Sequence, residues 1–361
     1  MNLKTGHIWI ATAALVLLSI IFMIPFMWML GTSLKVESKI QSEPLNLLPK
    51  APYIHRNGQW VQVRPVEVKE GLQIVQVLKP YVVRSGNIVL AGSAEDLNGA
   101  KPAPTTMPAG AKKPVALWDE ASNTLAIDPA DMHDRVFLNT ENYTLALQRS
   151  PFARFIVNTL IICILAVIGT VLSCSLVAYG LSCVDWRGRE LLFWVMLSTM
   201  MLPPQVTMIP LFMTFRKLGW INTILPLVVP AFLANAFFIF LLRQFYRSIP
   251  KDLIEAARID GCSELSIWAK IMVPLSRPAL AVVALFTFIN SWNDFLGPLI
   301  YLHREQKYTM AIGLAMFQGQ YQGDWGQLMA MSLLMTVPII TLFFFTQKTF
   351  IQGVKLSGIK G

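Results

Sequence analysis

The stretch from 255 to 278 reads EAARIDGCSELSIWAKIMVPLSRP and lies between two long apolar segments. Its charged and small residues make it too polar to cross lipid. The preceding Ser-Ile-Pro at 248–250 is a helix-start signal, and Gly261 ends that helix. Ser263 can cap a second short helix that runs to about Met272. The stretch therefore predicts a helix–turn–helix on the cytoplasmic side of a membrane.

Two interpretations of this segment stay open from its residues. The first helix has one narrow, mostly small face made of Leu253, Ala256, Ala257 and Asp260, which fall at i, i+3, i+4 and i+7. The second has an apolar surface made of Leu265, Ile267, Trp268 and Ile271. Such a segment can dock on a partner protein, to which Glu255 and Asp260 offer charges, or it can lie on the membrane surface as an amphipathic helix.

The composition is that of an integral membrane protein. Of 361 residues, 54% are hydrophobic and only 14% are charged, and the mean hydropathy is +0.52, whereas about 25% of residues are charged in soluble domains. The net charge of +9 and the pI of about 9.4 do not indicate nucleic acid. Membrane proteins concentrate Lys and Arg at their cytoplasmic edges for reasons of topology.

Six intervals without charged residues predict six membrane-spanning helices. They are 8–30, 155–184, 191–215, 218–242, 278–293 and 325–347, and the fifth is short unless it continues to about Leu302. The first interval is longer than the apolar part of a signal peptide and no A-x-A site follows it, which favours an anchor over a cleaved leader. Twelve Lys and Arg flank one side of the spans and five flank the other. This bias predicts both termini in the cytoplasm.

The region 35–150 is predicted to be an extracytoplasmic insert between the first two spans. Its runs 60–68, 72–78, 81–84 and 87–92 alternate apolar and polar residues and are rich in β-branched ones, so they predict a small antiparallel β unit. The tract 101–114 is predicted to be a loop. The insert either recognises something or acts as an accessory domain. The chain thus divides into a first span at 1–34, the insert, and a core at 151–361 with the polar loop at 248–277.

Catalytic and metal-binding signatures are missing from the sequence. The four cysteines, Cys163, Cys174, Cys183 and Cys262, have no C-x-x-C spacing, and the four histidines do not cluster. A phosphate-binding loop, H-E-x-x-H and G-x-S-x-G are also missing. We expect no catalytic residue, no cofactor, no metal and no nucleic acid partner.

A polar stripe ends the fifth span. Asn290, Asn293 and Asp294 fall on one face with Gly297, and an ionisable residue at membrane depth is a candidate for a transport pathway. The alternative is an interfacial anchor, with Trp292 at the level of the lipid headgroups. Further candidates for the pathway are Ser198, Thr199, Gln205 and Asn235.

The polar loop carries a spaced motif that resembles a known family. It places Gly six residues after the Glu of E-A-A, Ile ten residues further on, and Pro three beyond that: Glu255, Ala256, Ala257, Asp260, Gly261, Ile271 and Pro274. This resembles the EAA loop of permease subunits in ATP-binding-cassette (ABC) importers. The segments 141–160, 177–193, 201–212, 289–302 and 347–361 resemble the maltose-type carbohydrate-uptake branch. The long insert departs from that branch and weakens any inference about the substrate.

The resemblance implies an all-α membrane protein with the type I ABC importer permease fold and a β-rich insert. It implies a permease subunit that takes up a carbohydrate, either an oligosaccharide, a sugar or a polyol. The implied partners are a cytoplasmic ABC ATPase dimer, a second permease subunit, an extracytoplasmic solute-binding protein and the lipid bilayer of the inner membrane. The helix at 251–260 would couple to the ATPase, with Glu255 as its anchor. Gln352, Gly353 and Gly358 in the tail would also reach the ATPase.

Two other functions are compatible with the residues alone. A secondary transporter needs no ATPase but usually carries internal repeats and coupling-ion residues at the midplane, which the sequence does not display. A membrane-embedded enzyme or scaffold with an outer β domain is the other, and the lack of paired carboxylates or clustered His and Cys in the spans argues against the enzyme.

Overall fold

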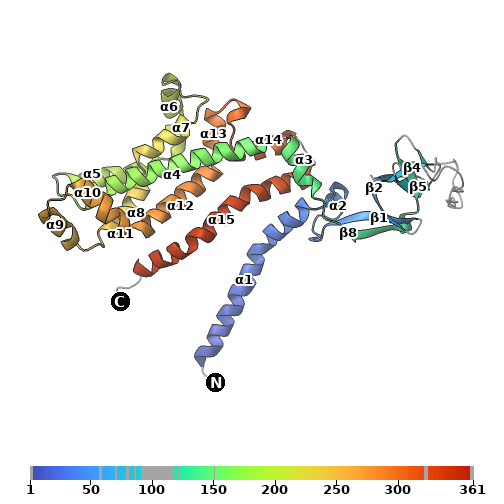
Figure 1. Cartoon of the computed structure of the whole chain (residues 1–361), viewed down its shortest axis with the longest axis horizontal. Helices are drawn as coiled ribbons and strands as arrows, with labels where there is room; N and C mark the ends of the chain where they lie inside the picture. The colour runs from blue at the N-terminus through green and yellow to red at the C-terminus, as the bar shows by residue number, and fades with distance from the viewer. Residues whose placement is uncertain are drawn as a thin grey trace. The chain divides into compact units, whose positions relative to one another are not determined.

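The chain forms two compact units in the computed structural model. The model describes residues 3–56, 59–69, 71–78, 81–84, 87–90, 118–119, 122–149, 151–320 and 324–357. The first unit comprises Met1–Ala146 and Gln322–Leu333, and the second comprises Leu147–Tyr321 and Leu334–Gly361. Figure 1 labels the helices and strands.

The first unit contains a long helix, a short helix and an antiparallel β-sheet. The helices are α1 (Leu3–Ser33) and α2 (Glu37–Ser42). The six-stranded sheet has the order β6-β7-β3-β2-β1-β8. Its strands are β1 (Lys50–Arg56), β2 (Gln59–Lys69), β3 (Leu72–Val77), β6 (Trp118–Asp119), β7 (Thr124–Ile127) and β8 (Met132–Val136), with the short helix η1 (Pro129–Asp131) before β8. A separate hairpin consists of β4 (Tyr81–Arg84) and β5 (Asn87–Leu90).

One face of the sheet is apolar and buried. Because successive side chains of a strand point to opposite faces, the alternating runs bury every second residue. In β2, Val61 and Val63 are buried whereas Trp60 and Arg64 are exposed. The buried core is formed by Ile54, Val61, Val63, Val75, Val77, Leu125 and Ile127.

The four runs predicted as strands form β2, β3, β4 and β5. Four further strands, β1, β6, β7 and β8, were not predicted. β1 contains Pro52, which argues against a strand in sequence terms, and β6 has only two residues. The residues of β7 and β8 do not alternate between apolar and polar. The tract 101–114 lies outside the described residues.

The segment that contains the sheet leaves and rejoins the helices at one place. The side-chain amide of Asn142, on α3 (Glu141–Arg149), donates to the carbonyls of Ser33 at 2.8 Å and Lys35 at 2.9 Å. The backbone N–H of Asn139 donates to the Leu34 carbonyl at 2.8 Å. Asn142 is buried. These bonds hold the end of α1 beside the start of α3, so both ends of the segment are fixed at a common neck.

The second unit is built from helices. The long ones are α4 (Phe152–Ser182), α12 (Arg277–Asn293) and α15 (Trp325–Ser357), whose residues up to Leu333 belong to the first unit. Those of medium length are α5 (Arg189–Ser198), α6 (Pro204–Lys217), α8 (Ala236–Tyr246), α9 (Asp252–Ile259) and α14 (Met310–Gln320). The short ones are η2 (Thr199–Met201), α7 (Leu225–Val228), η3 (Val229–Leu233), α10 (Glu264–Ile267), η4 (Trp268–Met272), α11 (Val273–Leu275), α13 (Leu296–Tyr301) and η5 (Glu305–Lys307).

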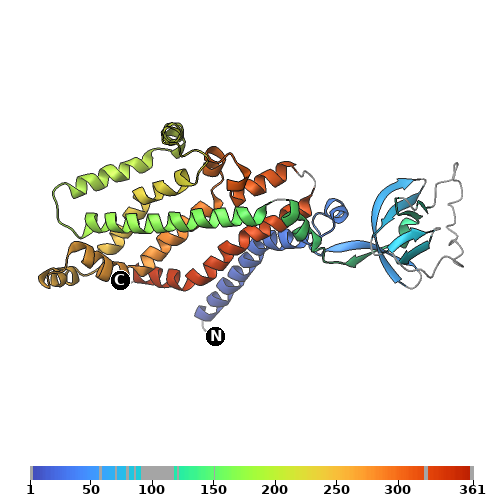
Figure 2. The same cartoon turned by 45° about the horizontal axis from the view of Figure 1, so that its top comes forward.

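Helix α4 is central to this unit. It packs along α8 and α12, as Figures 1 and 2 show. α4 also contacts η3, where a Cβ atom added at Gly169 would lie 2.6 Å from the ring of Phe232, so a larger residue would require that ring to move. Near the segment 252–275, Ala178, Leu242 and Val283 are completely buried in one apolar core.

The predicted spans are found with some breaks. Four helical segments are long and apolar enough to cross a membrane: Trp9–Ser33, Phe152–Ser182, Leu225–Tyr246 and Trp325–Thr346. Two further helix pairs pass the same test only together. They are Arg189–Met201 with Pro204–Lys217, bent by 97°, and Glu264–Leu275 with Arg277–Asn293, bent by 82°. The described residues therefore contain four such helices, or up to six if each bent pair is one span.

Prolines and polar caps explain where the predicted spans are interrupted. The interval 191–215 is not one straight helix, because Pro203 adopts an extended conformation before Pro204 starts α6. The interval 218–242 breaks at Asn235, whose side-chain oxygen caps α8 by accepting from Phe237 N–H at 3.0 Å. The fifth span does not continue to Leu302 as one helix. α12 ends at Asn293, and Asp294 is extended.

The helix–turn–helix predicted in the polar loop is confirmed. We call the segment Asp252–Leu275 the arm; it contains α9, α10, η4 and α11. Gly261 has φ +76°, and its N–H donates to the Arg258 carbonyl while Cys262 N–H donates to the Ala257 carbonyl, both at 3.0 Å. This is a Schellman motif, which satisfies the last carbonyls of α9. Ser263 then caps α10 by accepting from Ser266 N–H.

Replacing Ile54 by Ala tests the sheet core. Ile54 is 1% exposed, so we expect the sheet to lose about 2–5 kcal/mol through the lost transfer energy and the cavity left behind. Hydrogen exchange of the amides of β1 to β3 in the full chain should accelerate. The control Val66→Ala changes a residue of β2 that is 55% exposed and should cost less than about 1 kcal/mol. Equal protection in both variants would contradict the assigned core.

Replacing Gly261 tests the turn of the arm. No atom lies within 4 Å of a Cβ added at Gly261, so Gly261→Ala should cost only the conformational energy of a positive φ, about 1–2 kcal/mol. Gly261→Asn should cost less, because Asn tolerates this backbone region. The readout is amide exchange across α9 in each variant. If the Ala and Asn variants exchange at the same rate, backbone strain is not what makes glycine necessary.

Candidate functional site

The arm turns one face of α9 toward the helices and another face outward. Ile254 and Ala257 are buried in the apolar core of the second unit. On the outer side, Leu253 and Glu255 are exposed and Ile259 is 87% exposed. Leu253 and Ile259 thus present apolar side chains on the outer side of a charged helix.

The faces predicted from residue spacing are only partly correct. Ala257 belongs to the buried face, whereas Ala256 and Asp260 are exposed with Leu253. The periodicity defines which residues share a face but does not say how wide the packed face is. In the second half of the arm, Ile267 is also buried and belongs to the core.

The remaining residues of that predicted apolar surface are divided in the same way. Trp268 and Ile271 are half-buried and pack against the core, and Leu265 is exposed. Pro274 is exposed in α11. The exposed large apolar residues of the arm are therefore Leu253, Ile259, Leu265 and Leu275.

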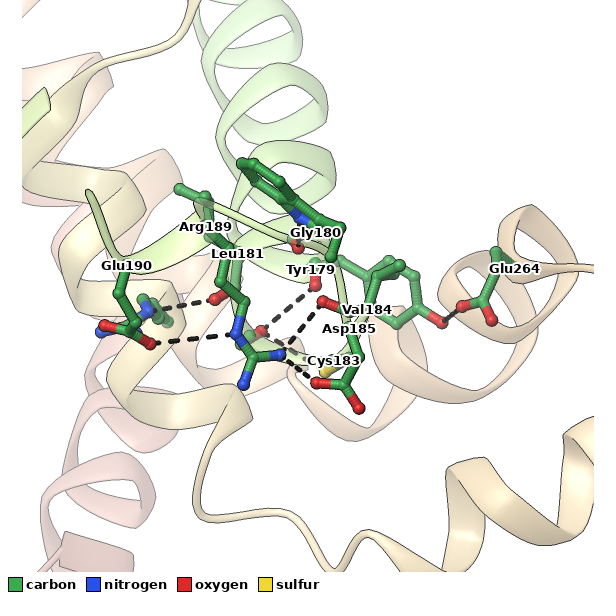
Figure 3. Close-up of polar contacts among 12 residues, drawn as sticks. Tyr179, Gly180, Leu181, Cys183, Val184, Asp185, Arg189, Glu190 and Glu264 are labelled. Atoms are coloured by element: carbon green, nitrogen blue, oxygen red, sulfur yellow. Dashed lines mark hydrogen bonds and ion pairs between the residues drawn. The ribbon is translucent and has the colours of Figure 1, made fainter. Parts of the chain in front are cut away.

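Four carbonyls at the end of α4 and just beyond it accept hydrogen bonds from side chains outside this helix. The last carbonyls of a helix have no partner within it and carry partial negative charge, which favours cationic donors. We call the carbonyls of Gly180, Leu181, Cys183 and Val184 the α4 hub (Figure 3). The donors are Trp186 Nε1 to Gly180 at 2.9 Å, Arg243 Nε to Leu181 at 3.2 Å, Arg258 Nη2 to Cys183 at 2.9 Å and Arg189 Nη1 to Val184 at 3.1 Å. The hub thus joins α4 to α5, α8 and the arm.

Arg243 is the most deeply placed of these donors. It is 3% exposed, and its guanidinium carbon lies 3.8 Å from the ring centre of Phe193. It also forms an ion pair with Glu190, in the first turn of α5. A buried guanidinium requires such partners, because an unpaired charge away from water is very costly. Arg243 therefore fixes α8 to both α4 and α5.

A second arginine ties the arm to α4. Arg258 Nε donates to the Glu264 carboxylate at 2.8 Å, and the Tyr179 hydroxyl donates to the same carboxylate at 2.5 Å (Figure 3). We call these three residues the clasp. The hydrogen bond that Arg258 donates to the Glu264 carboxylate raises the pKa of Arg258. The clasp connects α9, α10 and α4.

A cavity of about 280 Å³ lies beside the hub. It opens between the end of α4, the end of α8 and the inner side of α9. Its lining is mostly polar and includes Arg189, Glu190, Arg243, Arg247, Glu255 and Arg258. The arm is therefore packed through apolar residues on one side and faces polar space on another.

The residues predicted for a pathway lie at the end of α12 and directly after it. Asn290 and Asn293 are exposed on α12, and the Asn293 amide donates to the Ile289 carbonyl at 2.9 Å. Asp294 is half-buried and accepts from Gly297 N–H at 3.1 Å. Its carboxylate satisfies a backbone donor at the start of α13.

Trp292, which the sequence associates with the alternative of an interfacial anchor, packs between helices. Its side chain is completely buried and its Nε1 donates to the Met335 carbonyl at 3.1 Å. It stacks on Phe288. Sequence position near a span end does not separate an interfacial tryptophan from one that packs between helices.

The other polar candidates satisfy local backbone groups. Ser198 and Thr199 donate to the carbonyls of Val195 and Met196. Asn235 caps α8. Gln205 is exposed in the first turn of α6.

Two of the three candidate residues of the C-terminal tail lie among the described residues. Gln352 and Gly353 fall within α15, and Gly358 lies outside the described residues. Among the residues that the structure describes, three or more His, Cys, Asp or Glu side chains do not come together as a metal site. All four cysteines are free thiols.

Sequence reasoning missed Tyr179, Arg243 and Glu264. Arg243 and Arg258 were counted only among the basic residues that flank the spans. Each lies in the last turn of its helix, α8 or α9, where a cation is favoured. Tyr179 could not be paired with Glu264 from the sequence, because the two are 85 residues apart in the chain.

Comparison with known proteins identifies the family. Residues 177–356 match the family described as binding-protein-dependent transport system inner membrane component. The arabinooligosaccharides transport system permease protein AraQ of Halalkalibacterium halodurans is 40% identical over 204 residues, which are 56% of this chain and 73% of that protein. The trehalose/maltose transport system permease protein MalG of Thermococcus litoralis is 34% identical, over 61% of this chain and 81% of that protein.

A solved structure supports the same assignment. It is a bacterial ABC transporter involved in the import of the acidic polysaccharide alginate, with a TM-score of 0.54 and 28% identity over 60% of this chain and 81% of that one. The relatives are transport permeases whose ATP hydrolysis lies in a separate ATPase, so this chain is a multi-pass transport subunit of the inner membrane and not an enzyme. The chain belongs to the binding-protein-dependent inner membrane components, among the permease subunits of carbohydrate ABC importers.

Proposed function

We propose that this permease couples ATP-driven closure of two partner ATPase subunits to the passage of a carbohydrate across the membrane. The observation that supports this proposal most directly is the surface of the arm, where exposed Leu253, Ile259 and Leu265 surround exposed acidic residues. A surface with apolar anchors beside charges is typical of a protein interface. A helix lying on the membrane would instead place basic residues on its polar face.

Glu255 is proposed as the anchor of this interface. It is exposed and lines the cavity beside the hub, so a cationic side chain of the ATPase could reach it from outside. Ala256 and Asp260 share its exposed side of α9, and Gly261 gives the tight turn that follows. In the tail, Gln352, Gly353 and Gly358 are proposed as further contacts with the ATPase.

The proposed topology has six spans with both termini in the cytoplasm. Each of the two bent helix pairs would then be one span, and the excess of Lys and Arg would lie on the side of the arm. The segment 35–150 would be extracytoplasmic. α1 is apolar, and its residues from Trp9 to Met27 are exposed, which favours contact with lipid or with a second permease subunit.

The substrate is proposed to be an oligosaccharide, a sugar or a polyol. Support comes from the relatives, whose names include arabinooligosaccharides, trehalose and maltose, and lactose. A solute-binding protein would deliver it from outside. Asn290, Asn293 and Asp294 are proposed to contribute to the path, with sugar contacts shared with the second permease. The sheet of the first unit is proposed as an accessory domain.

Replacing Glu255 by Lys tests the docking surface. We expect the ATPase to bind at least about 30-fold more weakly, because losing one member of a desolvated charge pair costs about 2 kcal/mol or more. The measurement is copurification and titration of the ATPase with the purified permease pair. Asp252→Lys makes the same charge change in the first turn of α9 and should have little effect. Unchanged binding by Glu255→Lys would remove Glu255 as the anchor.

Reconstitution tests the transport activity. In liposomes that contain this chain, the second permease, the ATPase and the binding protein, we expect accumulation of labelled maltose or arabino-oligosaccharide only when ATP is inside the compartment facing the ATPase. Dissipating ion gradients should leave uptake unchanged. Uptake that persists without the ATPase would indicate a secondary transporter and reject the proposal.

A further inference from the structure

We propose that the clasp of Tyr179, Glu264 and Arg258 transmits movement of the arm to α4, and that these are positioning residues for coupling. This inference rests on the proposed function, since it requires an ATPase that moves the arm. The clasp lies behind the surface proposed to bind the ATPase, and its three residues come from α9, α10 and α4.

The clasp joins these helices by direct hydrogen bonds. Glu264 accepts from the Tyr179 hydroxyl at 2.5 Å and from Arg258 Nε at 2.8 Å, while Arg258 Nη2 reaches the Cys183 carbonyl at 2.9 Å. Among the described residues, these contacts are the polar links from α9 and α10 to α4. They fix both halves of the arm against the same helix end.

The surroundings of α9 make such a link necessary. Its apolar contacts come from Ile254 and Ala257, and apolar packing does not set direction as hydrogen bonds do. On another side, the cavity of about 280 Å³ leaves α9 without packed neighbours. A force on α9 could therefore tilt α9 into the cavity without moving α4. With the clasp closed, displacement of α9 must carry the end of α4 with it.

Through Tyr179, the clasp is attached to the end of a helix that contacts many other helices of the second unit. Tyr179 is 3% exposed and lies in the last turn of α4, one residue before the hub begins. α4 packs along α8 and α12 through most of its length. Movement at its end therefore reaches the helices that surround any path through the bundle.

The clasp contributes little to the fold itself. The side chains of Arg258 and Glu264 are 36% and 44% exposed, and pairs this accessible to water add little to stability. The apolar core around Ile254, Ala257 and Ile267 holds the arm in place. Loss of the clasp should thus change coupling while leaving assembly intact.

The test is Tyr179→Phe in the complete importer in liposomes, which removes one hydroxyl and no packing volume. We expect normal assembly and ATP hydrolysis, with the amount of solute transported per ATP reduced about fivefold, the factor for one lost hydrogen bond. Glu264→Gln keeps an acceptor but removes the charge and should give a smaller reduction. Arg258→Lys should fall between Glu264→Gln and Arg258→Ala.

Trp186→Phe is the matched control. It removes a side-chain donor to Gly180 of the same hub without touching the arm, and the ratio of transport to hydrolysis should stay at the wild-type value. An unchanged ratio in Tyr179→Phe would overturn the inference, and so would loss of assembly, which would make the hydroxyl merely structural. Failure of the wild-type complex to transport with ATP would instead reject the proposed function.

Discussion

The backbone carbonyls at the end of α4 are the constraint on which this unit depends. A long apolar helix satisfies its own hydrogen bonds except at its termini. Here the C-terminal carbonyls accept from side chains of the following loop, α5, α8 and the arm. Elements that are far apart in sequence meet because each supplies a donor to the same helix end. The hub is thus both a cap and a junction.

The contacts at the hub explain how the arm can be rigid and at the same time exposed to a partner. Its inner side is fixed by Ile254, Ala257 and the clasp, and its outer side keeps Ile259 and Glu255 exposed. Rigid presentation of apolar anchors lowers the entropy lost on docking. The polar cavity lies between these two sides, which gives the arm room on one side only.

Local signals in the sequence were sufficient for much of the fold and for the arm. Alternation predicted β2 to β5, and Gly261 with Ser263 predicted the turn, because these features act within a few residues. The bend at Pro203 and the break at Asn235 fell inside intervals that hydropathy treats as uniform. The burial of Trp292 and of Ala257 depended on which helices pack against them. The clasp was beyond prediction for the same reason, since its partners are brought together only by the bundle.

The neck at Asn142 has a consequence for how this chain could have diversified. The polypeptide departs after Ser33 and comes back at Asn139, and hydrogen bonds hold the two crossings together. The closure entropy of what lies between grows only slowly with its length. Residues between Ser33 and Asn139 could therefore be gained, lost or exchanged while the distance between these two ends stayed the same. A permease lineage can in this way acquire a new domain between α1 and α3 without changing how the transport helices pack.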